Sequence, residues 1–215
     1  MAAMEDVREV YAEPDDPRRP RVNVDECSVE LHKDVRSTEP AGPGRPARVD
    51  YEYERNGTAN LFVVVDPTAG RRHVTVTERR TKADVARQMK HLCDVMYPDA
   101  DRVRVVLDNL NTHTVGALYE SFPPEEARRL AAKLEFHYTP KHASWLNMAE
   151  LELSVLARQC LNRRIPDAAT LTAEVAAWQA ARNRDMVKIR WCFKVADARK
   201  KMARVYPQQT PAAVH

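Results

Sequence analysis

The fold of this chain is decided by the stretch Val103-Arg-Val-Val-Leu-Asp108-Asn109, a valine-rich run that ends on a carboxylate. Such a run is typical of a buried strand. Two more segments carry an acid at a comparable place: Val22-Asn-Val-Asp25-Glu26, and Trp145-Leu-Asn-Met-Ala-Glu150 in the first turn of an expected helix. Carboxylates that converge from separate elements need cations to balance their charge. The three segments therefore predict a site of the kind that holds two divalent metal ions and cleaves phosphodiesters.

Strands and helices are expected on both sides of these segments. Apolar and alternating runs predict five strands: Arg21–Leu31, Leu61–Val65, Arg72–Thr77, Asp101–Leu107 and Leu134–Tyr138. Caps and helical periodicity predict six helices: Thr81–Tyr97, Val115–Ser121, Pro123–Lys133, Asn147–Leu161, Leu171–Arg182 and a basic Val195–Tyr206. Thr38–Arg48, rich in proline and glycine, is expected to be a loop or the turn of a long hairpin.

This order of elements predicts an α/β protein of the ribonuclease-H-like type, with a mixed five-stranded sheet flanked by helices. In that arrangement the three acids would meet at one edge of the sheet. Residues 1–20, which end in the proline-rich Glu13–Pro20, are interpreted as the remnant of a linker. Residues 21–207 would form the domain with its basic terminal helix, and residues 208–215 a tail.

Composition narrows the class of protein only a little. The net charge of +3 is too small to prove a nucleic-acid partner, although 34 basic residues are available to meet phosphates. Four cysteines lie far apart with no CxxC pair, which argues against zinc and favours reduced thiols in a cytoplasmic protein. The first residues do not have the pattern of a signal peptide, and no apolar run is long enough for a membrane span.

Several separated motifs resemble one family. Asp108-Asn-Leu-Asn-Thr-His113, followed by Thr139-Pro-Lys-His-Ala-Ser-Trp-Leu-Asn-Met-Ala-Glu150, is similar to the signature of bacterial insertion-sequence transposases related to the mariner superfamily. More narrowly, it resembles the insertion-sequence group numbered six-thirty. Further matching segments are Asp50–Thr58, Trp191–Phe193 and Ala198–Pro207, so that the resemblance covers nearly the whole chain from about Asp16.

The resemblance implies a DDE site on a ribonuclease-H-like core, with Asp25, Asp108 and Glu150 as catalytic residues and as ligands of two Mg²⁺ or Mn²⁺ ions. It implies cleavage and strand transfer of double-stranded DNA, both transposon ends and target, by a probable homodimer. The 41 residues between Asp108 and Glu150 exceed the usual spacing, and Pro123–Lys133 could accommodate the excess.

The family's N-terminal helix-turn-helix domains have no counterpart in this sequence. A separate helix-turn-helix chain could supply that function, acting with this one at the bacterial nucleoid. Two other interpretations stay open. The chain could be an inactive or partner-dependent transposase remnant, or a non-transposing nuclease on the same fold.

Each acid also has a structural interpretation. Asp25 could be a solvated strand-end acid, with Glu26 on the opposite face of the strand. Asp108 could form an Asx-turn or a helix N-cap. Asn147 and Glu150 could form a capping box, and Glu152 competes with Glu150 as the third carboxylate, because periodicity does not choose between them.

The remaining candidates are polar or aromatic residues close to these motifs. Asn109, His113, Lys141 and His142 could contact DNA or support the metal site, or could be structural. Trp145 and Trp191 are expected to be core aromatics rather than platforms for base stacking. The basic terminal helix could follow DNA or simply be a solvated face; its charged residues are Arg199, Lys200, Lys201 and Arg204.

Overall fold

One mixed sheet organises the chain, and it has the five strands that the sequence predicts. The computed structural model describes residues 2–36, 39–46, 48, 51–141 and 143–191. The strands are β1 (Arg21–Asp34), β2 (Tyr53–Asp66), β3 (Arg71–Thr77), β4 (Val103–Leu107) and β5 (Leu134–Tyr138). Their order across the sheet is β3-β2-β1-β4-β5. Strand β2 runs antiparallel to both β1 and β3, whereas β4 runs parallel to both β1 and β5.

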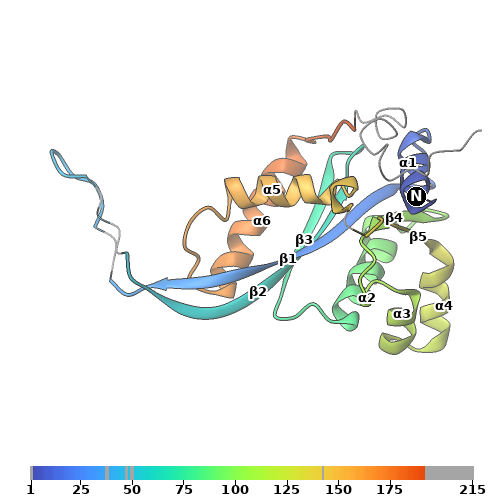
Figure 1. Cartoon of the computed structure of the whole chain (residues 1–215), viewed down its shortest axis with the longest axis horizontal. Coiled ribbons are helices and arrows are strands. Elements are labelled where there is room, and N and C mark those ends of the chain that lie inside the picture. The colour runs from blue at the N-terminus through green and yellow to red at the C-terminus, as the bar shows by residue number, and fades with distance from the viewer. Residues whose placement is uncertain (1, 37–38, 47, 49–50, 142, 192–215) are drawn as a thin grey trace, which may run out of the picture.

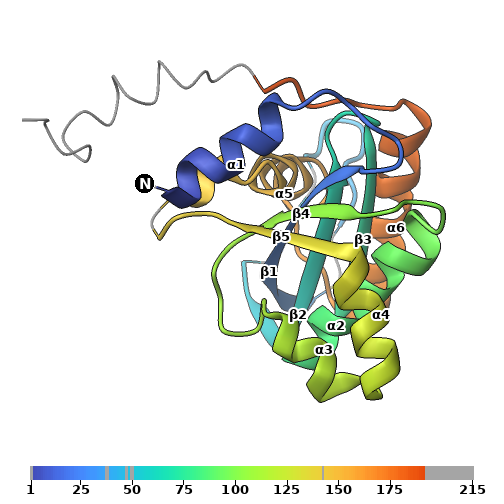
Figure 2. The same cartoon turned by 90° about the vertical axis from the view of Figure 1, so that its right-hand side faces the viewer.

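Helices cover both faces of this sheet. They are α1 (Ala2–Ala12), α2 (Lys82–His91) with the π-helical turn η1 (Leu92–Met96), α3 (Val115–Ser121), α4 (Pro124–Lys133), the 3₁₀ turn η2 (Ser144–Leu146), α5 (Ala149–Gln159) and α6 (Ala168–Arg184). Helices α2, α3 and α4 pack on one face, on a core that includes Val22, Val24 and Val105. Helices α5 and α6 pack on the other, on a core that includes Leu61 and Val63. Figure 2 shows α1 and α5 on one side of β4 and β5, with α3 and α4 on the other.

Capping residues explain why helices α2 and α4 begin at or next to the residues that the sequence predicts. Thr81 and Asp84 form the predicted capping box at the start of α2, with the Thr81 hydroxyl accepting from the Asp84 amide. Pro124 opens α4, where a missing amide hydrogen costs nothing. Among the described residues, no helix is long and apolar enough to cross a membrane.

The expectation of a linker over residues 1–20 is wrong for Ala2–Ala12, which form helix α1. Met4, Val7 and Val10 are buried against Val106 of β4 and Leu146 of η2. The helix therefore covers the part of the sheet that α5 leaves open. The predicted basic helix Val195–Tyr206 lies outside the described residues.

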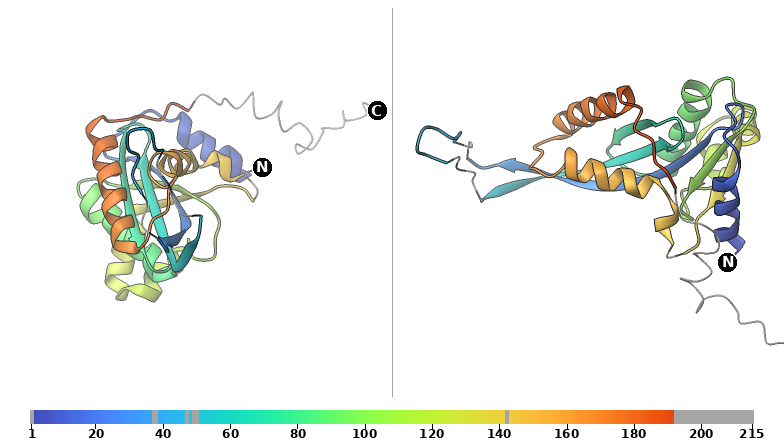
Figure 3. Two further views of the ribbon diagram at one scale, coloured as in Figure 1. Left: turned by 90° about the vertical axis from the view of Figure 1, so that its left-hand side faces the viewer. Right: turned by 90° about the horizontal axis from the view of Figure 1, so that it is seen from above.

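Strands β1 and β2 form a long hairpin, as expected from the loop at Thr38–Arg48. Each strand has 14 residues, and the outer half of β2, Tyr53–Thr58, is exposed. The hairpin extends well beyond the helices (Figure 1), and α5 runs along its base (Figure 3). The base of β1 is therefore fixed by packing on both faces, which matters because Asp25 lies there.

Two stacked imidazoles join β3 to the end of α2 and should make stability depend on pH. The rings of His73 and His91 lie 4.1 Å apart, centroid to centroid. Burial, and then the charges of His91 and Arg71, lower the pKa of His73 to about 4. Burial and Arg71 lower the pKa of His91 as well. Both rings are thus neutral in the folded protein at neutral pH.

We expect the stabilising contribution of this pair to fall as pH falls from about 6.5 to about 4. An unfolded chain protonates His73 near pH 6.5, so in this window the unfolded state binds more protons than the folded state. The measurement is the free energy of unfolding of the wild type and of His73→Phe, obtained by chemical denaturation over this pH range. Phe keeps an aromatic ring and cannot titrate. The difference between the two proteins should depend on pH; a constant difference would contradict the assignment.

Candidate active site

The three predicted acids lie at one end of the sheet, on elements that pack together. Asp25 lies in β1, Asp108 directly follows β4, and Glu150 lies in the first turn of α5. Strands β1 and β4 are parallel neighbours with Asn23 opposite Val106, so Asp25 and Asp108 come two residues further along each strand. Side chains alternate between the faces of a strand. Since Val24 points into the core under α2, Asp25 belongs to the face that α5 covers.

The pKa of Asp25 is raised in part by the charges of the other two acids. Burial, and then the charges of Glu150, Asp108 and Glu26, together raise the pKa of Asp25 to about 7. The Glu26 amide, which donates to Asp25 Oδ1 at 2.8 Å, acts in the opposite direction. Carboxylates that share a region of low polarity disfavour each other's ionised forms. The region is therefore one where negative charge is concentrated.

His113 lies between two carboxylates, those of Asp108 and Glu26. Its Nδ1 lies 2.6 Å from Asp108 Oδ1, and its Nε2 lies 3.0 Å from Glu26 Oε2. Burial by itself would lower the pKa of His113, but its contacts with Asp108 and Glu26 outweigh this and raise it to about 10. The imidazolium is thus charged at neutral pH. The geometry places His113 between two carboxylates, and its role at the site stays a prediction.

A cavity opens beside Asp108. It has a volume of about 440 Å³ and is lined by Asp108, Asn109, Leu110, Thr139, Pro140, Lys141 and Ser144. Asn109 and Lys141 are thus brought to the same place as Asp108, as their sequence positions suggested. His142 lies outside the described residues.

The structure separates Glu150 from Glu152. Glu150 is exposed at the start of α5, whereas the side chain of Glu152 is only 1% exposed and makes two ion pairs, to Arg72 at 2.9 Å and Arg182 at 2.6 Å. A carboxylate occupied by two arginines is a poor candidate for a metal ligand. The N-cap of α5 is Met148, and the Asn147 side chain accepts from the Ala149 amide rather than from the Glu150 amide, so Asn147 and Glu150 do not form the capping box.

The chemistry of the donors fits a hard divalent cation, although the three acids do not close around one point. Carboxylate oxygens are the ligands that Mg²⁺ and Mn²⁺ prefer. Within the described part of the chain, no three His, Cys, Asp or Glu side chains lie close enough together to hold a metal ion. One oxygen of Asp108 is instead engaged by His113.

Four polar residues at this site were not singled out from the sequence: Tyr11, Asn23, Glu26 as a partner of His113, and Asn147 as a buried side chain. Asn23 and Asn147 are 0% and 1% exposed. A polar residue between two valines, as in Val22-Asn-Val, was the available signal for Asn23. Trp145 is 41% exposed rather than a core residue, whereas Trp191 packs on Tyr11 with ring centroids 5.4 Å apart. Arg199, Lys200, Lys201 and Arg204 lie outside the described residues.

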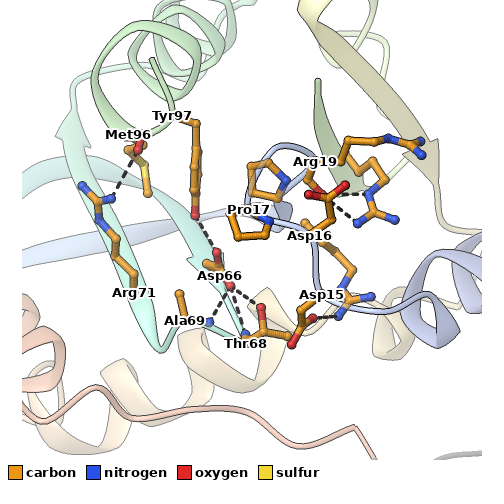
Figure 4. Close-up of a pocket in the computed structure, with 13 residues that line it drawn as sticks. Asp15, Asp16, Pro17, Arg19, Asp66, Thr68, Ala69, Arg71, Met96 and Tyr97 are labelled. Carbon is orange, nitrogen blue, oxygen red and sulfur yellow. Dashed lines mark hydrogen bonds and ion pairs between the residues drawn. The ribbon is translucent and has the colours of Figure 1, made fainter. Parts of the chain in front are cut away.

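A second cavity, of about 420 Å³, lies near Asp66 at the end of β2 and Arg21 at the start of β1 (Figure 4). Its polar groups bind one another: Tyr97 donates to Asp66 at 2.7 Å, and Arg21 pairs with Asp15 at 2.9 Å. This cavity shares no lining residue with the cavity beside Asp108, and none of the three acids lines it.

The architecture is similar to that of several solved structures. The chain superposes on the Mos1 Strand Transfer Complex with a TM-score of 0.58 at 16% identity, covering 86% of this chain and 54% of that one. It superposes on the Mos1 mariner paired end complexes with Mn and with Mg with a TM-score of 0.57 for each, at 18% and 19% identity, covering 86% of this chain and 55% and 54% of those. The predicted ribonuclease-H-like fold is confirmed.

The model of the family described as DDE superfamily endonuclease matches residues 20–172. The chain belongs to this family. It spans slightly more than half the length of the Mos1 chains. No curated protein matches it in sequence.

Proposed function

We propose that residues 21–207 are the catalytic domain of a DDE transposase from a bacterial insertion sequence of the mariner-related superfamily, in the group numbered six-thirty. The reaction would be metal-dependent cleavage of a DNA strand at the element's end, followed by strand transfer. One observation carries the proposal. Asp25, Asp108 and Glu150 come from three separate elements to one end of the sheet, where burial, and then the charges of Glu150 and Asp108, raise the pKa of Asp25. The DDE family match supports it independently.

The proposed catalytic residues and metal ligands are Asp25, Asp108 and Glu150. When bound, two Mg²⁺ or Mn²⁺ ions would activate the attacking water and stabilise the leaving 3′ oxygen. Mos1 paired end complexes are known with each of these metals, which supports the choice. Asn109, Lys141 and His142 are proposed to contact the DNA backbone near the cleaved bond, and His113 to support Asp108.

The chain's own residues would act by position and charge. Asp25, Asp108 and Glu150 would orient the reacting oxygens on one phosphodiester, while His113, charged and buried, keeps one oxygen of Asp108 in place. Water attacks phosphorus, the bond to the 3′ oxygen breaks, and that oxygen takes up a proton. The freed 3′-hydroxyl would then attack target DNA. No covalent bond between protein and DNA is required, so no Ser or Tyr nucleophile is assigned.

The partner would be double-stranded DNA, as transposon ends and as target. The titles of the Mos1 complexes name paired ends and strand transfer, which supports this partner. A homodimer and a separate helix-turn-helix chain belong to the proposal as well, and the site of action would be the bacterial cytoplasm at the nucleoid.

Nicking of supercoiled plasmid DNA in the presence of Mn²⁺ tests the proposal. We expect open-circular product with Mn²⁺, none with excess EDTA, and recovery when Mn²⁺ is restored. The Asp108→Asn variant, purified in the same way, controls for contaminating nuclease. Preference for RNA–DNA hybrids or four-way junctions would favour a non-transposing nuclease. No nicking by a folded wild type would favour a partner-dependent or inactive remnant.

A further inference from the structure

One buried amide lies between the two elements that carry Asp25 and Glu150. Asn147 is 1% exposed and comes after η2, two residues before α5 begins. Pairing of β1 with β4 ends at Asn23 and Val106. The carbonyl of the next β1 residue, Val24, accepts a hydrogen bond from Asn147 Nδ2 at 2.8 Å. The side chain of Asn147 thus supplies a hydrogen bond to β1 directly after the point where the backbone pairing with β4 ends.

The other side of the same amide binds the start of α5. Asn147 Oδ1 accepts from the Ala149 amide at 3.1 Å, and the Asn147 carbonyl accepts from the Glu150 amide at 3.1 Å. The side chain therefore bonds to the residue directly before Asp25 and to the residue directly before Glu150. To make both bonds, a side chain needs a donor and an acceptor on the same short group, as the amide of Asn has.

A closed set of hydrogen bonds keeps this amide in one orientation. Asn23 Nδ2 donates to Asn147 Oδ1 at 3.2 Å and to the Tyr11 hydroxyl at 2.5 Å. Tyr11 in turn donates to the Leu146 carbonyl at 2.7 Å. Because Asn147 Oδ1 receives two donors and Nδ2 faces a carbonyl, flipping the amide would place like groups together. Both polar atoms of the Asn147 side chain are therefore bonded in this one orientation.

We propose that Asn147 is a positioning residue that sets the spacing between Asp25 and Glu150, so that both carboxylates can bind the same divalent cation. This inference rests on the proposed function, because it concerns the metal site of that reaction. Asn147 touches neither carboxylate. It acts through the backbone on either side of them, as residues that support metal ligands commonly do.

The test is Mn²⁺ binding to the whole chain, measured by the electron paramagnetic resonance of free Mn²⁺. We expect Asn147→Ala to weaken binding by about tenfold or more. The matched control is Asn60→Ala. Asn60, in β2, is also a buried asparagine, with two side-chain hydrogen bonds, to Ser28 and to the Glu78 carbonyl. The control should lose stability and keep wild-type Mn²⁺ affinity. Equal losses of affinity in both variants, or none in Asn147→Ala, would overturn the inference.

Asn147→Ser serves if Asn147→Ala does not fold, since a hydroxyl can still cap the Ala149 amide but is too short to reach Val24. The same loss of Mn²⁺ affinity is expected. Amide hydrogen exchange at Ala149 and Glu150 gives a readout without metal and should be faster in both Asn147 variants than in Asn60→Ala. If the wild type binds no Mn²⁺, the proposed function fails. Unchanged exchange at Ala149 would then overturn the positioning role separately.

Discussion

Replacing Glu150 by Gln is expected to lower Mn²⁺-dependent nicking by about a thousandfold or more, with the free energy of unfolding unchanged. Glu150 is exposed at the start of α5, so the fold does not depend on its charge. Gln keeps the shape of the side chain and removes the negative oxygen that a divalent cation requires. Plasmid nicking, followed over several hours, together with urea denaturation measures both quantities.

Glu152→Gln is the comparison for Glu150→Gln, because Glu152 lies two residues away on the same helix. Nicking at the wild-type rate by Glu150→Gln would remove Glu150 from the site and reopen the choice of the third carboxylate. Loss of stability in Glu150→Gln would instead show that its charge is structural.

For Glu152→Gln we expect the reverse: a loss of about 3–5 kcal/mol in the free energy of unfolding. The side chains of Arg72 and Glu152 are 0% and 1% exposed, and Arg182 pairs with the same carboxylate. Glu152→Gln would leave the buried guanidinium charge of Arg72 uncompensated. It would also place a side-chain NH₂ group, which is a donor, next to the N–H donors of Arg72 and Arg182. Urea denaturation should show a lower midpoint with an unchanged slope.

Glu126→Gln is the matched control for this loss. Glu126 also forms ion pairs with two basic residues, Lys90 and Arg129, but its side chain is 26% exposed. Water screens such pairs, so the expected cost is below about 1 kcal/mol. Similar costs for Glu126→Gln and Glu152→Gln would mean that burial does not decide the strength of the Arg72–Glu152–Arg182 cluster.

Elements with strong local signals could be predicted from the sequence almost to the residue. Helices α3 and α4 and strand β5 end where their caps and apolar runs end. Helix α1 was missed because the proline-rich Glu13–Pro20 dominates that region, while the stability of α1 comes from Val7 and Val10 packing on distant residues. Tertiary packing of one face, which a local pattern does not contain, holds most helices in proteins.

At the site, the positions of the acids could be predicted, but their environment could not. Motifs locate Asp25, Asp108 and Glu150 on their elements, and no motif tells Glu150 from Glu152 by physical chemistry. What separates them is Arg72 on β3 and Arg182 on α6, both distant in sequence. The pairing of Glu26 with His113 likewise depends on β1 lying beside the segment that follows β4, which is distant in sequence.

The parallel pairing of β1 with β4 also determines when the acids can meet during folding. This pairing joins Asn23 to Val106, so it closes a loop that contains a large part of the chain. Contacts of such separation carry a high entropic cost and form slowly. Strands β1 and β2, joined by one hairpin, can associate much earlier. In a chain that is still folding, Asp25 and Asp108 therefore stay apart until β1 pairs with β4. We expect nuclease activity to appear only after this late step of folding.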